Sequence, residues 1–316
     1  MRRFLIGLVI TMLVSGCGGS NRLGGPGAIP SSYLVEDLGK FAGSGANLSL
    51  NNDGDVLVVL YPSAIPEDPQ VSETYLWAGG TRISLGPEIN GRDMNNLGQI
   101  VYESRNRSYF LEGGVSQDMG SLDGSSDTQV SAINDLGQAV GMSWGGDYDH
   151  PFLWQDGQMT DLGPDLDGAY AINNLGVIVA RTGIWKDGSL IPLPESCSGN
   201  AINDHNQMAG SIITEDIEFH AILWENGQLR DLGTLGGDYS SADGINDQGF
   251  VVGLSAIPES DEFHAFIWNG ELVDLNTRIP ADSGWELTGA QDINETGQIA
   301  GIGMLNGVPH VFLLTP

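Results

Sequence analysis

Basic side chains and long apolar stretches are scarce in this 316-residue sequence. Twelve Lys and Arg residues stand against 41 Asp and Glu residues, which gives a formal net charge of −29. A chain this acidic disfavours binding to nucleic acid or to an anionic membrane surface, and it favours cationic partners, divalent ions, neutral glycans or other proteins. The sequence also lacks an amphipathic helix of useful length, so the fold must rest on strands.

The first residues are typical of an export signal followed by a lipidation site. Arg2 and Arg3 precede an apolar run at residues 4–14 that is too short to span a bilayer. The run ends in Val14-Ser15-Gly16-Cys17, which resembles the bacterial lipobox, where a peptidase cuts before the cysteine and the cysteine is acylated. This resemblance predicts a signal peptide at residues 1–16 and a lipid anchor on Cys17. The alternative is an ordinary secretory signal with a chance cysteine.

Cleavage before Cys17 would leave a still more acidic chain. Ten basic and 41 acidic residues would remain, and Cys197 would have no disulfide partner. Residues 17–32 are rich in Gly, Ser and Pro, so we expect a flexible tether there and one domain at residues 33–316. We therefore expect a lipid-anchored protein of the bacterial cell envelope, at the outer membrane or cell surface, and Gly18 permits outer-membrane sorting.

A short motif recurs seven times and indicates the architecture. It consists of an apolar residue, Asn, usually Asn or Asp, a spacer and Gly, and the first asparagines are 44, 39, 39, 30, 43 and 48 residues apart. This spacing suits one four-stranded propeller blade per repeat. The copies are Leu50-Asn51-Asn52-Asp53-Gly54, Met94-Asn95-Asn96-Leu97-Gly98, Ile133-Asn134-Asp135-Leu136-Gly137, Ile172-Asn173-Asn174-Leu175-Gly176, Ile202-Asn203-Asp204-His205-Asn206, Ile245-Asn246-Asp247-Gln248-Gly249 and Ile293-Asn294-Glu295-Thr296-Gly297.

Each copy of the motif predicts a tight hairpin turn. Asn or Asp opens a type I turn, and Gly takes the left-handed position that closes it. In the fifth copy Asn206 replaces that glycine, and Asn is the residue that best tolerates this conformation after Gly. A short apolar strand follows each turn, then an aromatic strand such as Phe152-Leu153-Trp154, then a Gly-bearing turn and a third strand such as Met159-Thr160-Asp161-Leu162. A fourth strand leads into the next motif.

The two ends of the repeat region complement each other. The last unit stops at His310-Val311-Phe312-Leu313-Leu314 without its third strand, whereas Tyr33-Leu34-Val35-Glu36-Asp37-Leu38-Gly39 at the start matches that strand. We therefore predict an all-β fold: a seven-bladed β-propeller of four-stranded blades, closed by an N-terminal strand that completes the last blade. Closure of this kind removes the exposed edges of an open array.

Three of the repeats carry a family resemblance. His150-Pro151-Phe152-Leu153-Trp154, His220-Ala221-Ile222-Leu223-Trp224 and His264-Ala265-Phe266-Ile267-Trp268, each followed by Asp-Leu-Gly or Asp-Leu-Asn, resemble the bacterial HAF repeat, described as a probable extracellular repeat. The resemblance covers essentially all of residues 33–316. It fails in the first, second and fourth units, which lack the histidine. It implies an extracellular location and no established biochemical activity.

No residue is assigned a catalytic or metal-binding role from the sequence. Four of the five histidines occupy one repeat position, so we expect them around the ring in structural roles, and we expect the recurring tryptophans to pack between blades. Cys197 has no local partner and is interpreted as an inert thiol. Asn51-Asn52-Asp53-Gly54-Asp55 offers hard ligands for calcium, but the same turn recurs without Asp53, so a hairpin is the preferred interpretation. A structural calcium ion is left open.

Strand alternation in a meander sorts the connections onto two faces. The Asn motifs and the short Gly turns fall on one face, and the longer, more variable loops fall on the other, where binding usually resides. Trp144 and Trp285 are the two tryptophans outside the repeat pattern. Such aromatics suit sugar faces or protein hot spots, unless each packs against its own loop. The predicted ligand-binding set on this face comprises Trp144, Tyr148, Asp149, Asp238, Tyr239 and Trp285.

These observations favour a non-enzymatic binding or scaffolding propeller that contacts a protein or glycan through its long-loop face. An alternative is a propeller-fold polysaccharide hydrolase or lyase that uses loop carboxylates. A third is a structural or calcium-stabilised envelope protein. No nucleic-acid partner is expected, and the membrane is expected to be contacted only through the lipid anchor.

Overall fold

The computed structural model describes residues 27–316, apart from residues 42–44, 62–71, 123, 125–126, 146–147, 182 and 261. The predicted signal peptide, Cys17 and most of the predicted tether lie outside the described residues. No helix in the described part of the chain has the length and apolar character needed to cross a bilayer. A single short 3-10 helix, η1 (Leu275–Arg278), accompanies the strands described here.

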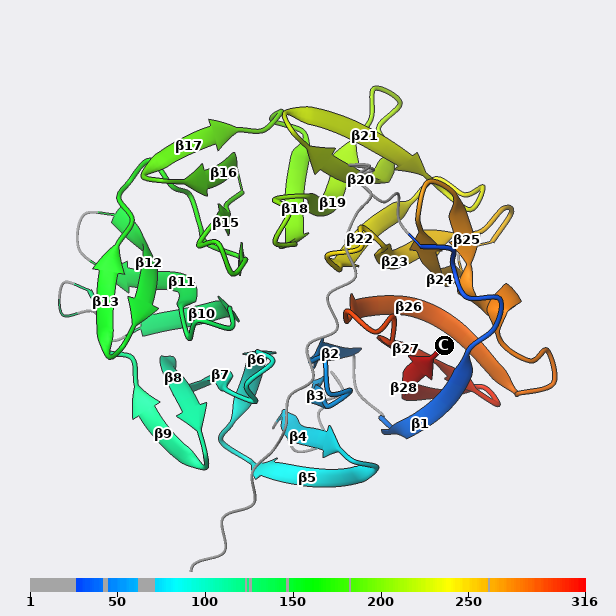
Figure 1. Ribbon diagram of the computed structural model, residues 1–316, viewed down its shortest axis with the longest axis horizontal. Coiled ribbons are helices and arrows are strands. Elements are labelled where there is room, and N and C mark those ends of the chain that lie inside the picture. The colour runs from blue at the N-terminus through cyan, green and yellow to red at the C-terminus, as the bar shows by residue number, and fades with distance from the viewer. Residues whose placement is uncertain are drawn as a thin grey trace, which may run out of the picture.

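Seven four-stranded antiparallel sheets surround a central axis as the blades of a propeller (Figure 1). This confirms the predicted all-β fold and its seven blades. Blade 1 contains β2 (Gly45–Leu50), β3 (Val56–Tyr61), β4 (Glu73–Ala78) and β5 (Thr81–Gly86); blade 2 contains β6 (Asn90–Met94), β7 (Ile100–Ser104), β8 (Arg107–Glu112) and β9 (Val115–Asp118); blade 3 contains β10 (Asp127–Ile133), β11 (Ala139–Gly145), β12 (Tyr148–Gln155) and β13 (Gln158–Asp161).

The remaining blades follow the same order, with the first strand beside the axis and the last at the rim (Figure 1). Blade 4 contains β14 (Ala171–Ile172), β15 (Ile178–Val179), β16 (Gly183–Lys186) and β17 (Ser189–Pro192); blade 5 contains β18 (Cys197–Ile202), β19 (Met208–Ile213), β20 (Phe219–Glu225) and β21 (Gln228–Gly233); blade 6 contains β22 (Ser240–Ile245), β23 (Val251–Ala256), β24 (Phe263–Trp268) and β25 (Leu272–Asp274); blade 7 contains β26 (Trp285–Ile293), β27 (Ile299–Leu305), β28 (Val308–Thr315) and β1 (Leu34–Lys40). The shortened fourth repeat thus forms a complete blade with two-residue inner strands.

The ring closes by the predicted exchange of a strand between the two ends. β1 pairs antiparallel with β28 from Leu34 opposite Thr315 to Lys40 opposite His310, and so supplies the outer strand of blade 7 (Figure 1). Leu38 of β1 is almost fully buried in the cluster that joins blades 7 and 1. The N-terminal strand is therefore both an edge of the sheet and part of the core.

The recurring motif forms the turn between the two inner strands of each blade, which we call the Asn turn. Its glycine has a positive φ in six blades, from 72° to 83°, and Asn206 takes φ 60° in blade 5. The backbone N–H of this residue donates to the carbonyl of the first asparagine in all seven turns. The predicted type I turn with a left-handed closing residue is confirmed, including the Asn206 exception.

The first asparagine of each Asn turn is buried, and in blades 2 to 7 its side chain joins the blade to the next one. Asn134 is an example: its Oδ1 accepts from the N–H groups of Leu136 and Gln138, and its Nδ2 donates to Gln138 Oε1 and to the carbonyl of Asn173 in blade 4. Six such bonds from Nδ2 to the next blade's asparagine carbonyl measure 2.8 to 3.0 Å. The amide thus completes its own turn and the contact between neighbouring blades.

The second residue of the Asn turn forms a closed circle of hydrogen bonds. In each blade its backbone N–H donates to the side-chain oxygen of the second residue in the next blade, and the seven distances are 2.7 to 2.9 Å. Only a residue with a side-chain acceptor can continue this circle. The members are Asn52, Asn96, Asp135, Asn174, Asp204, Asp247 and Glu295.

The repeat histidines tie the aromatic strand to the outer strand in four separate blades. Nδ1 of His150, His220, His264 and His310 lies 2.7 to 2.8 Å from the Asp carboxylate of the outer strand, and this pairing includes His310 with Asp37 of β1. The predicted distribution of these histidines around the ring is confirmed. Blade 2 lacks the histidine, but Arg107 stands at the same position and pairs with Asp118 through two bonds.

The hydrophobic core lies between the blades. Trp154, Trp224 and Trp268 are buried in clusters that join strands of adjacent blades, and Trp77 and Trp185 pack at the edges of similar clusters. The predicted packing role of the repeat tryptophans is confirmed. Each blade therefore packs against a neighbouring blade on both of its faces.

Replacing the buried asparagine of one Asn turn should be far more damaging than replacing its exposed tip. Asn134→Ala leaves the N–H groups of Leu136 and Gln138 without their partner and removes the bond to the carbonyl of Asn173 in blade 4, so we expect the free energy of unfolding to fall by about 3 kcal/mol. Leu136→Ala, in the same turn and 60% exposed, should change it by less than about 0.5 kcal/mol. Chemical denaturation of both variants checks this, and equal effects would contradict it.

Candidate functional site

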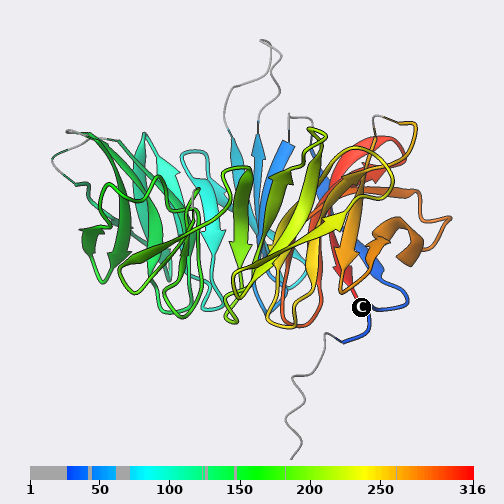
Figure 2. The same cartoon turned by 90° about the horizontal axis from the view of Figure 1, so that it is seen from above.

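The Asn turns enclose a funnel on the axis of the propeller, on the face where the C-terminus emerges (Figure 2). Its volume is about 380 Å³, and its lining is mostly polar. The circle of second residues forms the mouth, and the apolar residues that precede each Asn turn lie deeper. We call this side of the disc the Asn-turn face and the opposite side the long-loop face.

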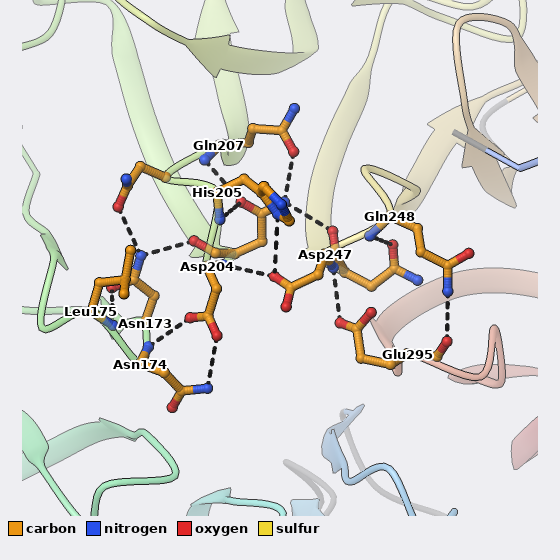
Figure 3. Close-up of polar contacts among 12 residues, drawn as sticks. Asn173, Asn174, Leu175, Asp204, His205, Gln207, Asp247, Gln248 and Glu295 are labelled. Carbon is orange, nitrogen blue, oxygen red and sulfur yellow. Dashed lines mark hydrogen bonds and ion pairs between the residues drawn. The ribbon is translucent and has the colours of Figure 1, made fainter. Parts of the chain in front are cut away.

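Negative charge is concentrated on one side of the funnel mouth. Asp204, Asp247 and Glu295 follow one another on blades 5, 6 and 7, each accepting a backbone N–H of the preceding blade (Figure 3). Burial raises the pKa of Glu295, and the neighbouring carboxylates Asp247 and Asp204 raise it further. On the other side of the mouth, blades 1, 2 and 4 carry the neutral Asn52, Asn96 and Asn174 at this position, and only blade 3 carries an acid, Asp135.

Two carboxylates lie deeper in the funnel and connect blades. A β-bulge precedes each of them in its inner strand, and bulges re-aim side chains. Asp93 accepts from the N–H of Ile133 in blade 3 and from Ser49 Oγ in blade 1. Asp292 accepts from the N–H of Leu50 in blade 1, across the seam where the ring closes.

Burial perturbs both of these carboxyl groups. It raises the pKa of Asp93, and it raises the pKa of Asp292 to about 7, where the charge of Asp93 adds to the rise. Both residues are half-buried and line the funnel. Their hydrogen bonds to neighbouring blades assign them to holding the ring together.

In the turn considered for calcium, the side-chain oxygen of the first asparagine is used within the turn. Asn51 Oδ1 accepts from the backbone N–H groups of both Asp53 and Asp55. Within the described residues, no group of three or more His, Cys, Asp or Glu side chains is placed to bind a metal ion. The hairpin interpretation of this segment is confirmed by its turn geometry.

The six residues of the predicted ligand-binding set lie at three separate places. Trp144 is the next-to-last residue of β11 and pairs with Asp149 of β12, so it belongs to a strand and not to the loop expected from the sequence. Tyr148 begins β12, and its side chain lies outside the described residues. Trp285 begins β26 and packs edge-on against His310 and Phe312 of its own blade, with ring centroids about 6 Å apart.

The third place brings the predicted Asp238 and Tyr239 together with residues that the sequence did not single out. The Tyr239 ring lies 5.6 Å from that of Phe219 in blade 5 and 5.5 Å from that of Phe263 in blade 6. Phe219 and Phe263 are 40% and 37% exposed. We call these three side chains the aromatic patch. It bridges two blades on the long-loop face, because β20 and β24 both begin there.

A signal for the two missed phenylalanines is visible in the sequence. Each stands directly before a repeat histidine, in Glu218-Phe219-His220-Ala221 and in Glu262-Phe263-His264-Ala265. Because the two phenylalanines belong to consecutive repeats, they lie in adjacent blades. Their exposure, however, depends on how the loops before them are folded.

An acidic groove adjoins the aromatic patch. It has a volume of about 540 Å³ and is lined by Glu218, Asp238, Glu259 and Ser260 together with Gly236, Gly237 and Ile257. Ile217, which precedes the groove in the chain, is 79% exposed and is held at φ 66° by the tight turn that Thr214 closes. Apolar surface and carboxylates therefore lie side by side at the loops of blades 5 and 6.

No protein-family model matches this chain, and no curated protein matches it. Among solved structures, it is similar to a puromycin-hydrolyzing peptidase of Mycobacterium tuberculosis, with 12% identity and a TM-score of 0.57 over 90% of this chain and 51% of that one. It is also similar to TolB from Acinetobacter baumannii, with 11% identity and a TM-score of 0.40 over 78% and 53% of the two chains. It is similar as well to a putative TolB from Agrobacterium tumefaciens, with 10% identity and a TM-score of 0.42 over 90% of this chain and 91% of that one.

The chain spans about half the length of the first two structures. At 10 to 12% identity these comparisons concern the fold alone and show nothing about function. The resemblance to the HAF repeat, like the lipid anchor, stays a prediction.

The raised pKa of Asp292 predicts a pH-dependent stability. Its pKa in the folded protein, about 7, is above the ordinary value of 3.8, so the folded state holds this proton more tightly. The contribution of Asp292 to folding is complete below the ordinary value and is lost as the pH rises through 7. We expect Tm to fall less between about pH 5.5 and 8 in Asp292→Asn than in the wild type.

The matched control for this measurement is Asp53→Asn, which removes an exposed carboxylate from an Asn turn. It should keep the wild-type dependence of Tm on pH. Calorimetric melts over the pH range check both variants. An unchanged pH dependence in Asp292→Asn would show that this carboxyl group does not take up the proton.

Proposed function

We propose that this protein is a lipid-anchored, extracytoplasmic binding propeller that holds a protein partner at the aromatic patch on its long-loop face. The observation that carries the proposal is the meeting of Phe219, Tyr239 and Phe263 across two blades beside an acidic groove. Exposed aromatic clusters of this kind are typical of interface hot spots.

The surroundings of the patch favour a protein segment that carries apolar and basic side chains. Ile213 and Ile217, 42% and 79% exposed, extend the apolar surface beside the rings. Glu218, Asp238 and Glu259 line the adjoining groove, and the whole chain is strongly acidic. Lys or Arg side chains of a partner would complement these carboxylates, and that complementarity would speed association at low salt.

The position of the N-terminal chain supports the proposed display. Gly27 lies near Gln248 and Phe250, and its carbonyl accepts a hydrogen bond from Asn269 Nδ2, which places the chain on the Asn-turn face. An anchor attached through this segment would leave the opposite, long-loop face directed away from the membrane.

A photo-crosslinking experiment tests the proposed partner site. A photoreactive phenylalanine analogue at position 263 of the full-length protein, expressed in its native envelope, should form an adduct with a protein whose linked peptide contains apolar and basic residues. Phe219→Ser/Phe263→Ser should weaken binding of that partner roughly tenfold or more. Glu218→Gln/Asp238→Asn should weaken it and reduce its sensitivity to salt.

The matched control is Trp144→Ser, which removes a 38% exposed aromatic side chain from blade 3 on the same face. It should bind the partner as the wild type does. Retention of the partner by the Phe219→Ser/Phe263→Ser variant would refute the site. Binding of an envelope glycan that these substitutions abolish would keep the site and replace the partner.

A further inference from the structure

Three exposed leucines stand in a row on the Asn-turn face. Leu97, Leu136 and Leu175 occupy the third position of the Asn turn in blades 2, 3 and 4, and they are 67%, 60% and 63% exposed. We call them the leucine arc. The other four blades carry Asp53, His205, Gln248 and Thr296 there. A leucine is thus not required by the turn, and the three are confined to consecutive blades.

The turns that carry the leucine arc are rigid and adjacent. Each leucine N–H donates to Oδ1 of the buried asparagine two residues before it, at 3.0 to 3.1 Å. The residues just before the leucines are joined between blades, because the N–H of Asn96 donates to Asp135 and that of Asp135 to Asn174. The three side chains therefore project together from a fixed rim of the funnel.

The N-terminal chain reaches the same face on the other side of the funnel. Residues 27–33 lie against the Asn turns of blades 6 and 7, and with Gln248, Phe250, Gly297 and Pro316 they enclose a small cavity. Gln248 holds the same turn position in blade 6 that the leucines hold in blades 2 to 4. An anchor at blades 6 and 7 and an apolar rim at blades 2 to 4 would thus support the disc at two opposite points.

We propose that the leucine arc contacts the surface of the membrane that carries the lipid anchor, and that this second contact holds the propeller flat with its long-loop face outward. The proposal rests on the anchored part of the proposed function, and it adds to the contact through the anchor that the sequence predicts. The occupant is a zwitterionic bilayer surface, since shallow insertion of leucine removes apolar surface from water. Anionic lipid would be repelled by Asp204, Asp247 and Glu295 at the funnel mouth.

A second copy of the chain fits this face less well than a bilayer. Two copies meeting through their leucine arcs would place both anchored N-terminal segments inside the interface, because these segments leave the disc on the same face. A bilayer receives the anchor and the leucines from one side. The geometry therefore favours lipid over a face-to-face dimer.

The experiment uses the full-length, lipidated protein in phosphatidylcholine vesicles. Leu136→Cys is labelled with an environment-sensitive fluorophore, while Cys197 stays unlabelled because it is buried. We expect its emission to shift to the blue and to be quenched by lipids that carry a shallow spin label. The same fluorophore at Asp149→Cys, an exposed position of blade 3 at the start of β12 on the long-loop face, should show neither change.

A variant with unlabelled leucines replaced tests the arc as a whole. Leu97→Gln/Leu175→Gln installs the residue that blade 6 carries at this position, so the turns should fold normally. In this variant the label at position 136 should lose most of its quenching. Its quenching should also fall when anionic lipid replaces part of the phosphatidylcholine.

Each remaining outcome has a definite meaning. Protein that does not float with vesicles would refute both the anchor and the leucine contact. Protein that floats while the label at position 136 is unshifted and unquenched would refute the leucine contact alone. A blue shift that depends on protein density and is insensitive to quencher lipids would assign the arc to a second copy and overturn the proposal.

Discussion

The fold depends on one side chain, the buried asparagine that opens each Asn turn. Its Oδ1 accepts from two N–H groups of its own turn, and in blades 2 to 7 its Nδ2 donates to a carbonyl of the next blade, as Asn134 shows. A shorter or apolar side chain cannot perform both tasks, and a carboxylate lacks the donor. Tight turns and contact between blades are therefore encoded by the same residue, which explains why the spacing of the repeats can vary from 30 to 48 residues without loss of the ring.

The same network gives the two faces of the disc different properties. The short turns on the Asn-turn face are hydrogen-bonded to one another. The second residue of each Asn turn must therefore carry a side-chain hydrogen-bond acceptor, whereas the third residue varies from blade to blade. Connections on the long-loop face carry no such constraint, and the aromatic patch arises where Tyr239 of one loop meets Phe219 and Phe263. The hydrogen-bonded turns of the Asn-turn face thus hold the blades in place while the loops of the long-loop face vary in length and sequence.

The repeated features of this protein were predictable from its sequence, whereas the singular features were not. Turn geometry, including Asn206, and closure by β1 follow from local rules and from the complementary ends. Arg107 was missed because its pairing with Asp118 replaces a histidine by different chemistry at the same position. Trp285 lies outside the repeat pattern, yet His310 and Phe312 cover it, and that contact depends on three-dimensional packing.

The closing strand also determines how the molecule responds to mechanical load. A pull transmitted through the N-terminal chain first meets the contacts of residues 27–32 with blades 6 and 7, and then Tyr33, which is buried and whose N–H donates to the carbonyl of Arg278. After Tyr33, the force reaches the paired strands β1 and β28 at the Leu34–Thr315 end. The hydrogen-bonded pairs would therefore break one after another and not all together. Under such a load the closing strand would separate from β28 pair by pair, after the contacts of residues 27–33 with blades 6 and 7 and with η1 have been broken.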